Sequence, residues 1–278
     1  MSSHSVRPAT EDQTATVFLK LGGSLITKKS SRHTARPETI TRVATEIGQA
    51  ILDRPNLRLV IGHGAGSFGH YDALRYGTQD GVTSSDGWRR FARIASATTR
   101  LNHIVFDALE SVGLPIIRWQ PSASAICEDG NITSLATPTI KAAVHHGLVP
   151  LVHGDVAFDT VRGGTILSTE VIFRYLAMFL RPKTILLAGL DQGVLEGYPH
   201  GKTVGVITPR NYSSISIALK PPSSPDVTGG MDTKVSEMLS IVKTQPKLQV
   251  RIFSADQPGV LRDALLENNI TCTTIRNQ

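Results

Sequence analysis

The chain has little cysteine and no long hydrophobic run, and each lack excludes a class of protein. Two cysteines among 278 residues are too few for a disulfide framework or a cysteine-based metal site. No apolar run reaches the roughly 18 residues that a membrane span needs. The polar N-terminal segment also lacks the apolar stretch of a secretory signal. We therefore expect a cytoplasmic protein with no membrane partner and a flexible tail over residues 1–16.

The positive charge is modest and is not concentrated in one place. The formal net charge is +6, and the densest basic segments, 27–32 and 87–93, are short and far apart in the sequence. Proteins that bind nucleic acids gather lysine and arginine into a patch or stripe, so we expect no nucleic-acid partner. A small anionic substrate accounts for the same surplus of charge.

Apolar segments alternate with amphipathic ones along most of the chain. Strands are predicted over 17–22, 57–64, 114–119, 148–155, 184–190 and 249–255. Helices are predicted over 37–52, 86–113, 168–181, 232–244 and 258–268. This alternation predicts a mainly parallel sheet covered on both faces, that is, a three-layer α/β/α sandwich. A hairpin that turns at Gly163-Gly164 and a surface loop over 214–230 complete one domain over 17–278, whose lobes 17–180 and 181–278 meet near residue 180.

Glycines cluster at 22–23, 64–69, 154 and 229–230, after predicted strands or before a helix. Such loops expose backbone N–H groups to anions, so four of them indicate a polyanionic ligand. Two familiar nucleotide loops do not fit. The GxGxxG at 64–69 is followed by turn residues instead of a long helix, and 197–203 has the wrong glycine spacing for a Walker A loop. The loops therefore indicate a different phosphate cradle.

Three lysines strengthen this interpretation. Lys20 lies inside an apolar strand, where lysine is rare unless it is paired. Lys29 follows the first glycine pair, and Lys234 is predicted in the first turn of a helix, where a cation opposes the helix dipole. An anionic ligand that these side chains share would explain all three positions.

Several segments together resemble the isopentenyl phosphate kinases of the amino acid kinase superfamily: KLGGSLITKK, HGAGSFGH, QPSA at 120–123, HGDV and DVTGGMDTKV. The resemblance covers about 17–278, and the second histidine of HGAGSFGH separates this family from the acetylglutamate, carbamate and uridylate kinases, although a phosphonate kinase can share it. It implies ATP and Mg²⁺ as cofactors, a prenyl monophosphate as acceptor, and a homodimer. The lobe 17–180 would hold the acceptor phosphate and 181–278 the nucleotide.

The resemblance also assigns roles to particular residues. Catalytic roles go to Lys20, Lys29, His70, Glu170 and Lys234. The acceptor phosphate would lie against Gly64, Ala65, Gly66 and Gly154, with His70 as a hydrogen-bond donor. The nucleotide would contact Lys20, Gly22, Gly23, Lys29, Asp191, Gly193, Gly229, Gly230 and Lys234. No residue is expected to ligate a metal directly.

Two departures from the family pattern leave alternatives open. Thr169-Glu170 replaces a Gly-Asp pair whose carboxylate orients the lysines, and the stretch around Asp191 differs from the usual nucleotide strand end. The chain could instead phosphorylate a phosphonate such as fosfomycin or another small acid. It could also be a regulator that binds a nucleotide without turnover. The helix 87–112 could line the acceptor pocket through Phe91, Ile94 or Ala95, or simply pack the core.

Overall fold

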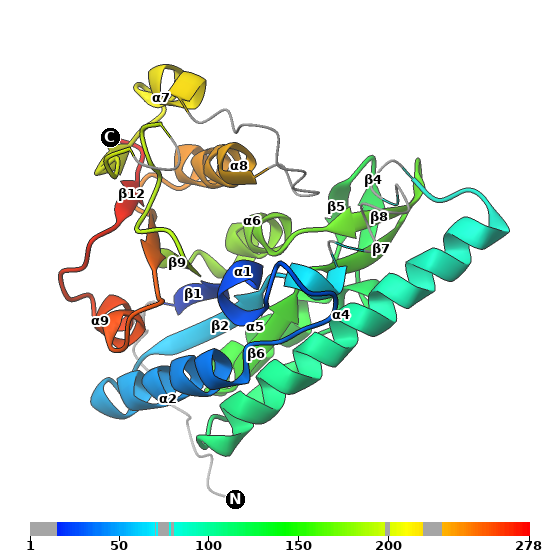
Figure 1. Cartoon of the computed structure of the whole chain (residues 1–278), viewed down its shortest axis with the longest axis horizontal. Coiled ribbons are helices and arrows are strands. Elements are labelled where there is room, and N and C mark those ends of the chain that lie inside the picture. The colour runs from blue at the N-terminus through cyan, green and yellow to red at the C-terminus, as the bar shows by residue number, and fades with distance from the viewer. Residues whose placement is uncertain (1–15, 70, 72–77, 79–80, 198–200, 219–229) are drawn as a thin grey trace, which may run out of the picture.

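A computed structural model describes residues 16–69, 71, 78, 81–197, 201–218 and 230–278. Its largest element is a sheet in the order β10-β12-β11-β9-β1-β2-β6-β3 (Figure 1). Neighbouring strands in it are parallel except for the antiparallel pair β11 and β12. In the order of the sheet, the strands are Val206–Ile207, Thr273–Ile275, Gln249–Ser254, Thr184–Gly189, Thr16–Leu21, Arg58–His63, Val149–His153 and Ile116–Arg118. This architecture confirms the predicted α/β fold with a mainly parallel sheet.

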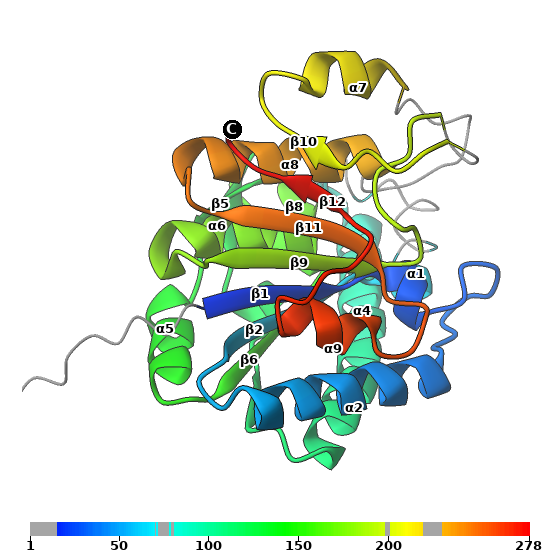
Figure 2. The same cartoon turned by 90° about the vertical axis from the view of Figure 1, so that its left-hand side faces the viewer.

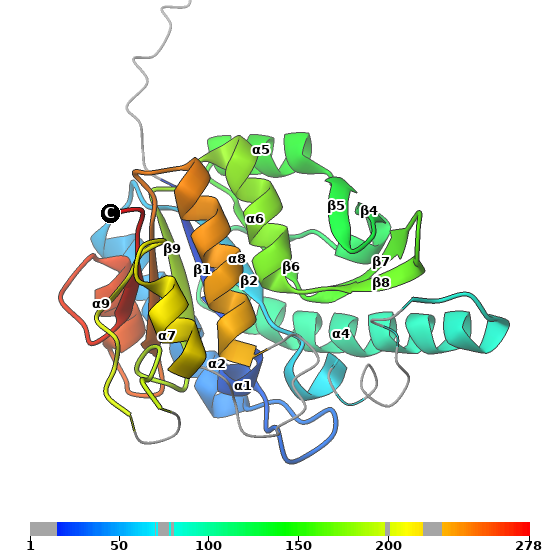
Figure 3. The same ribbon diagram turned by 90° about the horizontal axis from the view of Figure 1, so that it is seen from above.

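Helices cover both faces of the sheet, as Figures 2 and 3 show. The helices are α1 Gly23–Ile26, α2 Pro37–Asp53, α4 Ser85–Ser111, α5 Thr137–His145, α6 Thr169–Leu180, α7 Tyr212–Ala218, α8 Gly230–Thr244 and α9 Val260–Leu265. Successive strand residues serve opposite cores because side chains alternate along a strand. Phe18 packs in the core beneath α5, α6 and α8, whereas Leu19 packs in the core beneath α2, α4 and α9.

A second, four-stranded sheet lies beside the N-terminal part of α4 (Figure 3). It contains β4 Ile126–Glu128, β5 Asn131–Ser134, β7 Asp155–Asp159 and β8 Gly163–Leu167. The strand predicted over 148–155 is present as β6 but ends at His153, because the chain leaves the large sheet at Gly154 and begins β7 at Asp155. The predicted turn at Gly163-Gly164 is wrong, since both glycines belong to β8. The Asp159 carboxylate forms the turn by accepting hydrogen bonds from Val161 N (2.9 Å) and Arg162 N (2.8 Å).

Other differences from the predictions are smaller. Thr16 already belongs to β1, so the predicted tail is one residue too long, and residues 1–15 lie outside the described chain. The predicted loop over 214–230 overlaps α7, which is helical up to Ala218. No helix in the described ranges is long and apolar enough to cross a membrane. The division into two lobes near residue 180 stays a prediction.

Candidate active site

The largest group of predicted site residues meets in one cavity at the carboxyl ends of β1, β2, β6 and β9, where ligands bind in α/β sheets. The cavity contains about 1070 Å³ of space not filled by atoms, part of it open to solvent. The predicted residues that line it are Lys20, Gly22, Gly23, Lys29, Gly64, Ala65, Ile94, Gly154, Glu170, Asp191 and Lys234. The segments that carry them are far apart in sequence, so the fold assembles the site.

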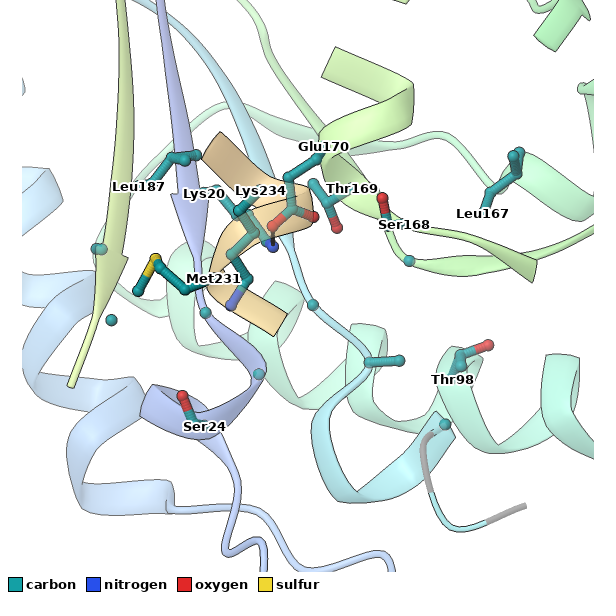
Figure 4. A pocket seen from close by; sticks show the side chains of 18 of the residues that line it. Lys20, Ser24, Thr98, Leu167, Ser168, Thr169, Glu170, Leu187, Met231 and Lys234 are labelled. Carbon is teal, nitrogen blue, oxygen red and sulfur yellow. Dashed lines mark hydrogen bonds and ion pairs between the residues drawn. The ribbon is translucent and has the colours of Figure 1, made fainter. Parts of the chain in front are cut away.

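A buried ion pair joins two walls of this cavity. Lys20 projects from β1 and donates a hydrogen bond to Glu170 Oε1 in the first turn of α6 (Figure 4). Only 7% of Lys20 and 4% of Glu170 is exposed. Burial opposes ionisation of Glu170, but the charges of Lys20 and Lys234 and the hydrogen bond from Lys20 lower its pKa overall. Glu170 is therefore ionised at neutral pH and holds the Lys20 ammonium in place.

Two further lysines reach the cavity from other elements. Lys234 lies on α8 and is drawn beside Lys20 and Glu170 in Figure 4. Because α8 begins at Gly230, Lys234 lies beyond the first turn in which it was predicted. Lys29 lines the cavity from the segment after α1. Since Glu170 balances Lys20, these two lysines offer positive charge to an anionic ligand.

The two glycine loops pack backbone against backbone. A Cβ on Gly23 would lie 2.5 Å from Gly66 N, and one on Gly64 would lie 2.8 Å from Gly23 N. Gly66 has a φ of +49°, and a Cβ there would lie 2.2 Å from the Thr27 hydroxyl. Gly64 and Ala65 can therefore face the cavity while Gly66, which does not line it, holds the loops together.

The His63 carbonyl connects two more walls of the site. It accepts hydrogen bonds from Gly154 N (2.9 Å) and from the Thr169 hydroxyl (2.7 Å). A Cβ on Gly62 would lie only 2.5 Å from the methyl carbon of Thr169, so Thr169 packs directly against Gly62. Thr169 therefore sets the distance between the start of α6 and the ends of β2 and β6.

Two neutral histidines stack directly behind these loops. The rings of His63 and His153 lie 5.4 Å apart with an interplanar angle of 14°. His63 Nδ1 lies 3.1 Å from the Gly64 carbonyl oxygen and Nε2 lies 3.1 Å from Asn102 Nδ2, which fits a neutral ring that donates at Nδ1 and accepts at Nε2. Burial is the main reason that the pKa of each histidine falls to about 3; the neighbouring His153 lowers the pKa of His63 further, and Arg118 lowers that of His153.

This stack predicts acid-sensitive folding. Well above pH 6.5, the ordinary pKa of histidine, both histidines are neutral in the folded and unfolded states. Between pH 6.5 and about 3 the unfolded chain binds protons that the folded chain excludes, so the free energy of unfolding falls as pH falls. His153→Phe keeps a stacked ring without this proton site. Urea unfolding from pH 7.5 to 4.5 should show a flatter pH dependence for the variant; equal slopes would contradict the prediction.

Besides Gly66, four predicted residues lie elsewhere or cannot be placed. Gly193 faces β12, where a Cβ would lie 2.5 Å from the Thr273 hydroxyl, and Gly230 begins α8 while Met231 lines the cavity. His70 and Gly229 lie outside the described residues. In α4, Ile94 lines the cavity and Phe91 and Ala95 do not, although all three pack in one cluster with Trp88.

The lining residues that the sequence reasoning did not predict include Ser24, Thr98, Asp155, Ser168 and Met231. Most of these are neighbours of predicted residues. Asp155 could have been found, because it directly follows Gly154 in the HGD segment and a carboxylate at a strand end is itself a signal.

Comparison with known proteins shows the family of this chain. Residues 15–254 match the family model of the amino acid kinase family. The isopentenyl phosphate kinase of Methanothermobacter thermautotrophicus is 32% identical over 271 residues, which cover 93% of this chain and 98% of that protein. The Methanocaldococcus jannaschii enzyme of the same name is 34% identical over 255 residues, or 90% and 94% of the two chains.

A solved structure gives the same result. The crystal structure described as isopentenyl phosphate kinase has a TM-score of 0.79 and 30% sequence identity, and the match covers 94% of this chain and 99% of that one. Both the sequence matches and the shared fold extend over nearly the whole chain. The chain therefore belongs to the amino acid kinase family and, within it, to the isopentenyl phosphate kinases.

Proposed function

We propose that this protein transfers the γ-phosphoryl group of ATP to isopentenyl phosphate, giving isopentenyl diphosphate and ADP. An oxygen of the acceptor phosphate attacks the γ-phosphorus, and the bond between that phosphorus and the β,γ-bridging oxygen breaks. The observation that supports this best is the convergence of Lys20, Lys29 and Lys234 with the glycine cradle in one cavity. Phosphoryl transfer depends on such positioning and neutralisation of charge.

In this proposal the two ends of the cavity bind different anions. The lysines, with Gly22 and Gly23, contact the β- and γ-phosphates, and Asp191 faces the nucleotide. Gly193 and Gly230 act only indirectly, through the turn after β9 and the start of α8. Gly64, Ala65 and Gly154 form the cradle of the acceptor phosphate, Gly66 supports it from behind, and His70 donates a hydrogen bond to that phosphate. A phosphate monoester has a second pKa of about 6, so its oxygen is already anionic at pH 7 and needs no general base.

Mg²⁺ fits this cavity only as an ion carried by ATP. In the described part of the chain, no group of three or more acidic, histidine or cysteine side chains could hold a metal. Lys20 binds Glu170, and the hydroxyl of Thr98 and the amide of Ser122 bind Asp155, which leaves Asp191 among the lining carboxylates to face a hydrated ion. When bound, Mg²⁺ would neutralise phosphate oxygens. The cytoplasmic location and the homodimer implied by the family belong to the same proposal.

A substrate panel tests the proposed function. We expect labelled phosphate from ATP to reach isopentenyl phosphate with a kcat/KM about 100-fold above that for fosfomycin, a ratio that one pocket can reach by differential transition-state binding. Other prenyl monophosphates in the panel define the range of acceptors. Preferred transfer to fosfomycin would support the phosphonate kinase instead. ATP binding without any transfer in a single-turnover assay would support a regulator.

A further inference from the structure

A buried carboxylate that the proposed chemistry does not use lies in the acceptor half of the cavity. Asp155 directly follows Gly154 and is the first residue of β7. It lines the cavity, yet only 1% of the residue is exposed. A carboxylate buried beside an anion-binding loop is unfavourable unless protein donors bind it, so its partners indicate why it is there.

Both oxygens of Asp155 bind neighbouring elements. Oδ1 accepts a hydrogen bond from the Thr98 hydroxyl on α4 (2.9 Å), and Oδ2 accepts one from Ser122 N in the short 3₁₀ turn Pro121–Ala123 (3.1 Å). Thr98 itself lines the cavity and is drawn on the α4 side of it in Figure 4. The Asp155 carboxylate therefore connects α4, which lines the acceptor half of the cavity, to the loop that contains Gly154.

A second contact runs parallel to the first. The Gln120 amide donates to the Thr99 hydroxyl on α4 (3.3 Å) and to the Ser122 hydroxyl (2.9 Å). Consecutive threonines of α4 thus bind the segment 120–123 and Asp155 together. This arrangement gives a structural reason for the QPSA segment, which has no residue in the cavity lining.

We propose that Asp155 is a positioning residue that fixes α4 relative to Gly154 and thereby sets the shape of the acceptor half of the cavity. It acts through Thr98 and Ser122 and makes no contact with the phosphate donor. This inference rests on the proposed function only for the identity of the acceptor. The arrangement of α4, the 3₁₀ turn and β7 is a property of the folded chain and can be measured without substrate.

Steady-state kinetics test the role in binding. We expect Asp155→Ala to raise the KM for isopentenyl phosphate about tenfold, as expected when buried hydrogen bonds are lost, while the KM for ATP stays the same. Asp155→Asn should recover most of the affinity. The side-chain oxygen of the new asparagine can accept the hydrogen bond from Ser122 N, and its NH₂ group can donate to the Thr98 hydroxyl oxygen. The Thr98 hydroxyl can then donate its own hydrogen to the Ala95 carbonyl (3.0 Å).

Asp159 provides a matched control at the other end of the same strand. It is also buried and accepts four backbone hydrogen bonds, from Asp129, Gly130, Val161 and Arg162, but it does not line the cavity. Asp159→Ala should lower the thermal midpoint and leave both KM values unchanged. Equal rises of both KM values in Asp155→Ala, or an Asp155→Asn variant no better than Asp155→Ala, would overturn the proposal.

Hydrogen–deuterium exchange of the ligand-free protein gives a readout that does not depend on the substrate. Asp155→Ala should speed exchange in α4 around Thr98 and in segment 120–124, and Asp155→Asn should restore protection. Asp159→Ala should leave both segments protected. Unchanged protection in Asp155→Ala would overturn the positioning role even if the enzyme phosphorylates isopentenyl phosphate. Faster exchange would support the role even if the acceptor proves to be another phosphate or phosphonate.

Discussion

Lys20→Met will lower kcat by about 10²- to 10³-fold, the loss seen when one donor that stabilises a transition state is removed. The Lys20 ammonium is held at the cavity wall by Glu170, so no reorganisation is needed when charge develops on the transferring phosphoryl group. Lys28→Met is the matched control, because Lys28 is exposed and does not line the cavity. Steady-state turnover of ATP and isopentenyl phosphate measures both variants.

The same substitution has a consequence for stability. Lys20→Met leaves the Glu170 carboxylate buried without its hydrogen-bond donor, a change that costs about 3 kcal/mol when a buried pair is broken. The double variant Lys20→Met/Glu170→Gln removes the unpaired charge and should recover most of this loss in urea unfolding, but none of the activity. A Lys20→Met variant that folds and retains full turnover would contradict the catalytic assignment of Lys20.

The sequence predicted the parts of the site that depend on local chemistry. Lys20 stood out because a lysine in an apolar strand needs a partner, and the structure supplies Glu170. The glycine loops stood out because a strand that ends in glycine can expose its amides. The sheet was predictable because long apolar strands such as 184–190 alternate with long amphipathic helices. The lysine and glycine signals each lie within one short segment, and the sheet follows from the order of segments along the chain.

The second sheet and the Asp155 contacts depend on contacts between distant segments. The strands of the second sheet are short. The Asp159 carboxylate sets the turn between β7 and β8, so the neighbouring pair Gly163-Gly164 wrongly suggested the position of the turn. The N–H of Gly154 binds the carbonyl of His63, a residue 91 positions earlier in the chain, and β7 begins at the next residue. No pattern within residues 148–155 reports that bond. Sequence reasoning therefore located the glycine loops but not the second sheet and the Asp155 hydrogen bonds that position them.

Glu170→Asp will lower kcat by about 10²-fold, the cost of misplacing a reacting group by about 1 Å. The family pattern has aspartate at this position, but it follows glycine, whereas Glu170 follows Thr169. The Thr169 hydroxyl binds the His63 carbonyl and its methyl group lies against Gly62, so Thr169 fixes the distance between the start of α6 and β2. At that distance the longer side chain of glutamate reaches Lys20, and aspartate falls short.

The double variant Thr169→Gly/Glu170→Asp separates this explanation from a simple loss of the native side chain. Removing the Thr169 side chain lets α6 approach β2, so the double variant should recover part of the kcat that Glu170→Asp loses. Glu170→Gln keeps the length of glutamate without its charge; it should lower kcat without raising the KM for ATP, since the lysines lose their anionic partner but not their own charge. A Glu170→Asp enzyme with full kcat, or a double variant no better than it, would show that residue 169 does not set the reach of residue 170.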